Sequence, residues 1–498
     1  MGAADKRRRA WTARGALWLS ASSWATKAAQ TVVLLVLAKA LAPAEFGILA
    51  VAALTYNVLI ALNQLGVSDA LTFLTDRIEQ ASRTALTIVV VGGLILTGVT
   101  WALAPLIAHF FHSPGASFVL RGFALGIPFD AAAQVPMGRL TRALSFSRRA
   151  ITDGLPQLIG AVVTISIVLA GHPIWGLVVG QVAGSVSNAI VATVIGPACL
   201  PGWDRFSARQ LLAYGKYLSG ADILNLGLLN VDYLIVGHIL GPRALGLYSL
   251  AYRLCFMPYV AISVVANGAL FPYYCGLPTR QAKARTAESA IALITALSAP
   301  WFAGLVLFAG DIALLGAKWA PATNSVRFLA VYGFFLALIL SFLEVLKAVG
   351  HTRLVFASRC IHLALLSGVL VATVRLGITA VALDQACVAG VVALLTGLWM
   401  IRRTAMRGAA IVRAIGLPML GTLGMAVVVL ALSRIPALGV VPSWTGLLIV
   451  GPIALGVYAA IVRLVMPGPL QGGWAALRNR PVMPSDGQRG ALRSADAR

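Results

Sequence analysis

The chain has 498 residues, of which 59% are hydrophobic and only 11% are charged. Because a soluble protein carries about 25% charged residues, this composition excludes a soluble globular protein and indicates a polytopic membrane protein. The net charge of +23 would suggest a nucleic-acid partner in a soluble protein. In a membrane protein, lysines and arginines instead hold loops on the cytoplasmic side.

Apolar runs follow one another along nearly the whole chain. A spanning helix needs roughly 20 apolar residues, and proline or glycine separates many of the runs. We therefore predict an all-α polytopic membrane protein with about 14 transmembrane helices, at 16–41, 46–68, 85–111, 117–138, 151–171, 174–196, 214–240, 245–270, 288–310, 326–348, 354–373, 378–401, 415–433 and 445–465.

The basic residues alternate between the two sides of these predicted spans. With the N-terminus placed in the cytoplasm, 30 lysines and arginines lie inside, 7 lie outside, and Lys27 and Arg253 lie within spans. This asymmetry predicts that both termini are cytoplasmic.

Two segments of the chain copy each other at a distance of 199 residues. Residues 35–52 read LVLAKALAPAEFGILAVA, and residues 234–251 read LIVGHILGPRALGLYSLA. This offset carries span one onto span seven, so each repeat has six spans and both have the same orientation in the membrane. Such a parallel repeat is typical of transporters. The expected organisation is a basic N-terminus (1–15), two six-helix lobes (16–196 and 214–401), two extra C-terminal helices (415–465) and a disordered cytoplasmic tail (466–498).

Ionisable side chains at membrane depth are costly and therefore are candidates for function. Lys27 lies near the middle of span one with Gln30 close by, and we expect it to face a cavity rather than only a packing interface. Arg253 lies about 15 Å deep in span eight, and its planar guanidinium suits phosphate oxygens. The alternative for both is a buried ion pair, for example with Asp222 or Asp232.

Span seven carries Asp222, Asn225, Asn230 and Asp232. Three of them share one helical face, and a carboxylate beside amide oxygens can bind a proton or Na⁺. We expect Asp222 and Asp232 to take part in ion coupling. Glu344 and Lys347 are expected to form an intrahelical pair, and Asp130 is expected to be isolated.

The sequence shows no motif for a metal or a cofactor. The five cysteines form no CxxC pair and the histidines show no HExxH spacing, so neither a metal site nor a catalytic residue is predicted. No loop is long enough to hold an aqueous catalytic domain. We therefore expect a protein that is not an enzyme.

Several segments resemble the oligosaccharide flippase family of the multidrug/oligosaccharidyl-lipid/polysaccharide exporter superfamily. The resemblance is carried by LAPAEFG at 41–47, QLGVSDAL at 64–71, DYLIVG at 232–237, LGPRALGLY at 240–248 and LAYR at 250–253. It implies a fourteen-helix protein whose two lobes enclose a central cavity. It also implies a location in the bacterial inner membrane and translocation of undecaprenyl-diphosphate-linked oligosaccharide repeat units for exopolysaccharide, O-antigen or capsule synthesis.

Under this resemblance each candidate residue has an expected role. Lys27 and Arg253 would contact the diphosphate, and Gln30, Asn225 and Asn230 would contact sugar hydroxyls. H⁺ or Na⁺ would drive transport by alternating access, and polymerase and chain-length-control proteins of the same pathway would be partners. The alternatives are a cation antiporter of the same superfamily for drugs or metabolites and, in another class, a membrane-embedded glycan polymerase or glycosyltransferase.

Overall fold

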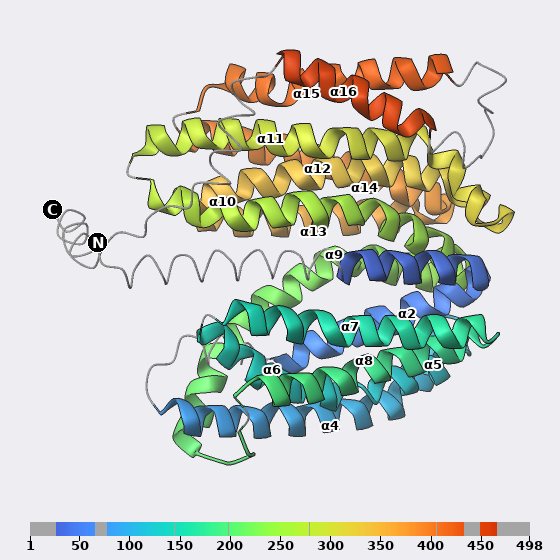
Figure 1. The fold of residues 1–498 in the computed structure, drawn as a ribbon, viewed down its shortest axis with the longest axis vertical. Coiled ribbons are helices and arrows are strands. Elements are labelled where there is room, and N and C mark those ends of the chain that lie inside the picture. The colour runs from blue at the N-terminus through green and yellow to red at the C-terminus, as the bar shows by residue number, and fades with distance from the viewer. Residues whose placement is uncertain are drawn as a thin grey trace. The chain divides into compact units, whose positions relative to one another are not determined.

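The computed structural model describes residues 26–64, 77–143, 145–197, 199–277, 279–404, 406–432 and 449–465. Within these ranges the chain is helical and contains no strand. The predicted N-terminus (1–15) and tail (466–498) lie outside the described residues. The chain divides into two compact units, Met1–Ser249 and Leu250–Arg498, and each is described by itself (Figure 1).

The first unit is a bundle of apolar helices. The most extensive helix packing in this unit is between α7 and α8, which lie side by side (Figure 1). A second group, α2, α4 and α8, surrounds α6. The helices of this unit are residues 26–40, α2 (Pro43–Gln64), α4 (Ile78–Phe110), α5 (Ala116–Ala124), α6 (Ile127–Arg142), α7 (Phe146–Leu169), α8 (Pro173–Ile195) and the part of α9 (Arg205–Pro258) up to Ser249.

The two copies of the sequence repeat pack directly on each other inside this unit. A Cβ added at Gly47 would lie 1.9 Å from the carbonyl oxygen of Pro242, and one added at Gly246 would lie 1.7 Å from that of Pro43. Only glycine lets the two backbones approach this closely. Since each glycine meets the proline of the other copy, the contact is self-complementary, as at a two-fold axis.

Helix α9 begins with a side-chain cap and is broken at one glycine. Asp204 precedes its first turn, and its Oδ2 accepts hydrogen bonds from the Ser207 amide at 2.9 Å and the Ser207 hydroxyl at 2.6 Å. These bonds hold the pKa of the Asp204 carboxyl below its usual value. At Gly241 the backbone has φ 81° and ψ −179°, which glycine adopts readily. The predicted break between spans seven and eight is thereby confirmed.

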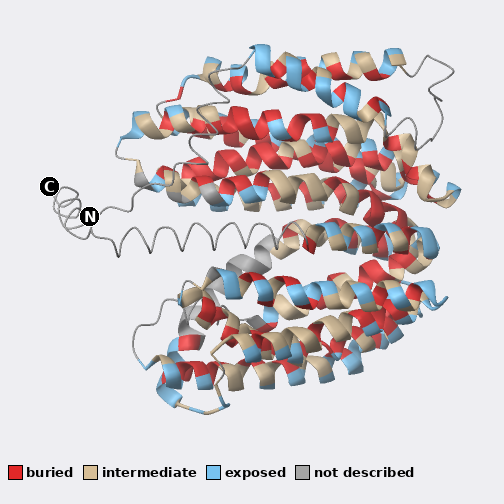
Figure 2. Cartoon of the chain, in the orientation of Figure 1, coloured by how far each residue is buried: buried red, intermediate tan, exposed pale blue. Residues whose placement is uncertain are grey.

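The second unit is built around one deeply buried helix, α12. In the most apolar 18-residue stretch of Ala317–Ala348, 72% of the residues are buried. Figure 2 shows buried residues gathered on α11 and α12. The predicted pair on α12 is confirmed, with Lys347 Nζ 2.5 Å from Glu344 Oε1. The elements are the end of α9, η1 (Tyr259–Val264), α10 (Val265–Gly276), α11 (Arg280–Leu307), η2 (Ala309–Leu315), η3 (Ala317–Ala322), α12 (Thr323–Ala348), α13 (Thr352–Thr373), η4 (Val374–Leu376), α14 (Ile378–Arg403), α15 (Gly408–Leu432) and α16 (Gly451–Val465).

Eleven helices in the described residues are long and apolar enough to cross a membrane. One of them covers 50 residues, Leu226–Cys275. It contains the break at Gly241, and as one straight helix it would be about 75 Å long at 1.5 Å per residue, far beyond a hydrocarbon core of about 30 Å. The first predicted span is described only from residue 26, and α16 has 15 residues. The chain is thus a multi-pass membrane protein, and the count of fourteen spans stays a prediction.

Candidate functional site

A chain of polar side chains links the helix at residues 26–40 to α7. Lys27 is half-buried, and its Nζ donates a hydrogen bond to Gln30 Oε1 at 3.2 Å. Gln30 Nε2 in turn donates to Gln157 Oε1 at 2.7 Å. The structure therefore brings the predicted residues Lys27 and Gln30 together and adds Gln157, which the sequence had not indicated.

Helix α7 exposes two different faces. Gln157 is exposed on one of them. The exposed apolar side chains of α7 lie on another face, about 100–160° around the helix axis from Gln157 at 100° per residue. They are Ile151, Leu155, Leu158, Val162 and Leu169. Lipid favours the apolar face, whereas exposed amides at membrane depth favour water. The exposed Gln157 side chain therefore lies on a different side of α7 from the apolar face that suits lipid.

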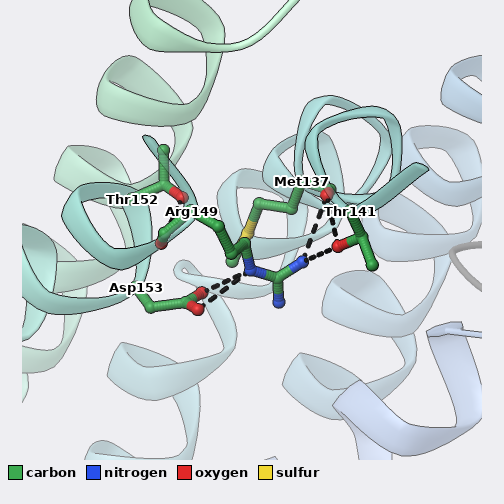
Figure 3. A network of polar contacts seen from close by, with 5 residues as sticks. All are labelled: Met137, Thr141, Arg149, Thr152 and Asp153. Atoms are coloured by element: carbon green, nitrogen blue, oxygen red, sulfur yellow. Dashed lines mark hydrogen bonds and ion pairs between the residues drawn. The ribbon is translucent and has the colours of Figure 1, made fainter. Parts of the chain in front are cut away.

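The same side of α7 carries charge one and two turns before Gln157. Arg149, Asp153 and Gln157 follow each other at intervals of four, which places them along one side of the helix. Arg149 Nε donates to both carboxylate oxygens of Asp153 at 2.9 and 3.0 Å. Its Nη1 donates to Thr141 Oγ1 at 2.8 Å and to the Met137 carbonyl at 3.1 Å (Figure 3). This network fastens the end of α6 to the start of α7.

A second polar network joins α2, α6 and α8. Asp130 is half-buried, and its Oδ2 accepts hydrogen bonds from the Tyr56 hydroxyl and, at 2.7 Å, from Ser185 Oγ. Its Oδ1 accepts from Asn188 Nδ2 at 2.8 Å. The expectation that Asp130 is isolated is therefore wrong, because helix packing brings polar groups that are distant in sequence onto one carboxylate.

The acids and amides predicted on span seven all lie on α9. Asp232 is fully buried and accepts from the Tyr248 hydroxyl at 2.7 Å and from the Tyr233 amide at 2.9 Å. Tyr248 follows the break at Gly241, so this bond ties the two arms of α9 together. Asn230 Nδ2 donates to the Leu226 carbonyl at 2.8 Å.

Three further residues were predicted as part of the site. The side chains of Asp222 and Asn225 lie outside the described part of the structure. Arg253 is half-buried and belongs to the second unit. The roles expected for these three residues stay predictions.

Sequence reasoning missed Gln157, Tyr56, Ser185 and Asn188. The four-residue spacing from Arg149 through Asp153 to Gln157 was a usable signal for a polar side on α7. No comparable signal exists for the other three residues, because their common partner is set by packing. Among the described residues no group of three or more histidines, cysteines or acids could hold a metal ion.

Known proteins resemble the chain in sequence and in fold. A family model described as "Polysaccharide biosynthesis protein" matches residues 36–324. The succinoglycan biosynthesis transport protein ExoT of Rhizobium meliloti (strain 1021) is 24% identical over 351 residues, covering 68% of this chain and 69% of that protein. The teichuronic acid biosynthesis protein TuaB of Bacillus subtilis (strain 168) is 24% identical over 300 residues, covering 59% and 62%.

Two solved transporter structures share the fold. The lipid II flippase MurJ in an inward closed conformation matches with a TM-score of 0.74 and 14% identity, covering 90% of this chain and 98% of that chain. An inward-facing multidrug resistance transporter of the MATE family matches with a TM-score of 0.60 and 15% identity, covering 76% and 94%. At these identities the likeness shows the fold alone.

Proposed function

Since the chain belongs to the family of polysaccharide biosynthesis proteins, we propose that it is a flippase for lipid-linked oligosaccharides. Its substrate would be an undecaprenyl-diphosphate-linked repeat unit, moved across the bacterial inner membrane by ion-coupled alternating access. The names of ExoT and MurJ, a transport protein and a lipid II flippase, support transport rather than an enzymatic reaction.

The observation that carries this proposal is the hydrogen-bonded chain of Lys27, Gln30 and Gln157. An ammonium group at membrane depth costs about 2.5–3.5 kcal/mol, so a structural role alone explains it poorly. A cation beside two exposed amides matches the chemistry of a diphosphate attached to a sugar: Lys27 would bind phosphate oxygens. Gln30 and Gln157 would exchange hydrogen bonds with sugar hydroxyls.

The remaining predicted residues extend this assignment. Arg253 is proposed as a second phosphate ligand, and Asn225 and Asn230 as further sugar contacts. H⁺ or Na⁺ would supply the driving force, with Asp222 and Asp232 as the coupling groups predicted from the sequence.

The test uses a gene deletion and plasmid-borne variants. We expect the deletion strain to accumulate undecaprenyl-diphosphate oligosaccharide in the inner leaflet, and the intact gene to clear it. We expect Lys27→Ala to slow clearance by about tenfold or more, because one charge-assisted contact to phosphate is lost. Combining it with Arg253→Ala should slow clearance further.

Two control variants make this result specific. Lys27→Arg keeps the charge and should retain most activity. Arg375→Ala removes an exposed arginine on η4 and should behave like the wild type. Undiminished clearance by the double variant would refute the phosphate role, and export of organic cations without any glycan phenotype would favour a cation antiporter.

A further inference from the structure

The polar network around Asp130 lies deep in the first unit and has no part in the substrate contacts proposed above. Asp130 is nine residues before Arg139 on α6, which places it about 14 Å along the helix from that arginine. It is therefore well inside the apolar stretch Ala116–Arg142. An ionised carboxylate at such a depth is costly.

Among the described residues, the hydrogen bonds that Asp130 accepts come from neutral groups. Two hydroxyls converge on its Oδ2, those of Tyr56 and Ser185, and they also contact each other at 3.1 Å. Gln181 Nε2 donates to Ser185 Oγ at 3.4 Å from one turn earlier on α8. Tyr56 and Ser185 are buried, at 9% and 2% exposure.

The helices around Asp130 supply no opposite charge to it. Helix α8 contains no ionisable side chain, and α2 contains Tyr56 and, at its start, Glu45, whose carboxylate accepts from the Ala42 amide. On α4 the ionisable groups lie near the two ends of the helix. On α6 and α7 the arginines lie toward the end of α6 and the start of α7, where Arg149 binds Asp153. The groups on α4 are Glu79, Arg83 and His109, near its two ends. Helix α5 carries Arg121, which is exposed and whose Nε donates to the Trp101 carbonyl at 3.3 Å. Among the described residues no ion pair of Asp130 is found.

The fold itself does not require this carboxylate. By the 199-residue offset of the sequence repeat, α6 corresponds to residues 326–341 of α12 in the second unit. Helix α12 carries no acid from Thr323 to Phe342. This stretch of α12 holds buried Ser325 and Ser341 but packs without a carboxylate, which argues that Asp130 serves more than packing.

We propose that Asp130 is a proton-binding site whose loading couples a proton gradient to transport. In the step, a hydronium ion gives its proton to Oδ2 and leaves as water, which converts the carboxylate into a carboxylic acid. Oδ2 then carries a hydrogen, so the hydroxyls of Tyr56 and Ser185 can no longer both donate to it, and at least one must rotate. Protonation thereby rearranges the contacts between α2, α6 and α8. The assignment of coupling to transport rests on the proposed flippase function, but proton binding itself does not.

A proton fits this site better than Na⁺. Sodium needs several oxygen atoms that present lone pairs, whereas three donors here point their hydrogens at the carboxylate. Asn188 presents its amide nitrogen to Oδ1. All three donors would have to turn before a metal ion could bind.

The first experiment measures proton binding without transport. Infrared difference spectra between acidic and mildly alkaline pH are recorded on purified full-length protein in sodium-free and sodium-containing buffer. We expect the wild type to show a band of a protonated carboxyl that is absent in Asp130→Asn and shifted in Tyr56→Phe, whose carboxyl has lost one donor. An unchanged band in Asp130→Asn, or a band removed by Na⁺, would overturn the proposal.

The second experiment measures coupling in the deletion strain. We expect a protonophore to slow glycan clearance in the wild type, and Asp130→Asn to reduce this dependence by at least about fivefold. Ser185→Ala, which keeps the carboxyl, should retain protonophore sensitivity and serves as a second variant if Asp130→Asn folds poorly. Sensitivity retained by a folded Asp130→Asn protein would overturn coupling at Asp130 and leave the flippase function intact. No clearance by the wild type would refute the flippase function and leave the infrared result valid.

Discussion

Arg148 and Arg149 are adjacent and equally charged, but only Arg149 is held in a network. Arg148 is exposed, whereas the side chain of Arg149 is 28% exposed. Arg149 also bonds to the Met137 carbonyl, Thr141 and Asp153. Its contribution therefore comes from position and not from charge alone.

This difference leads to a prediction for stability. Arg149→Ala should lower the free energy of unfolding by about 1–2 kcal/mol, because Asp153 and the Met137 carbonyl lose a partly buried donor. The measurement is the thermal unfolding midpoint of purified protein in detergent. Arg148→Ala is the matched control and should change it little, so equal effects of the two variants would count against the network.

At the scale of elements, the defining contact is the crossing of α2 and α9 at the repeated segments. Pro43 and Gly47 meet Gly246 and Pro242 backbone to backbone. Because the contact lies between main-chain atoms, neither helix can relieve an added methyl group by changing a rotamer.

Gly47→Ala and Gly246→Ala should therefore each destabilise the protein by at least about 1–3 kcal/mol. The double variant should cost less than the sum, since helices already pushed apart leave room for the second methyl group. Gly98→Ala on α4 is the control, because a Cβ there meets nothing within 4 Å. Thermal unfolding of the four variants checks this, and full additivity would contradict the reciprocal contact.

At the scale of the whole molecule, the combined length of α13 and η4 matches the thickness of a membrane. Arg353 and Arg375 are exposed at their two ends. Arg375 is 22 positions after Arg353, which corresponds to about 33 Å of helix, close to the hydrocarbon thickness of about 30 Å. The two arginines should therefore lie on opposite sides of the bilayer.

Cysteine labelling tests this topology. In a background without the five native cysteines, Arg375→Cys should react with a membrane-impermeant maleimide in intact spheroplasts. Arg353→Cys should react only after permeabilisation, because the excess of basic residues places its side in the cytoplasm. Equal labelling of both positions would contradict the predicted orientation.

The sequence alone determined the features that depend on local composition and on repetition. Apolar runs indicate membrane helices because lipid tolerates no unsatisfied backbone, which forces each run to be helical. The duplicated motif was visible without coordinates. The break at Gly241 and the Glu344–Lys347 pair were predicted from the sequence, and Lys27 and Gln30 were identified from it as candidate site residues. Each of these depends on residues close together in the chain.

Only the tertiary structure decided which distant residues meet. Gln157 lies 127 residues after Gln30, and Ser185 lies 129 residues after Tyr56. Helix packing in a uniformly apolar chain is set by side-chain shape rather than by hydrophobic pattern. The sequence therefore left open that Asp130 gathers two hydroxyls and an amide, and that the two repeated segments bind each other.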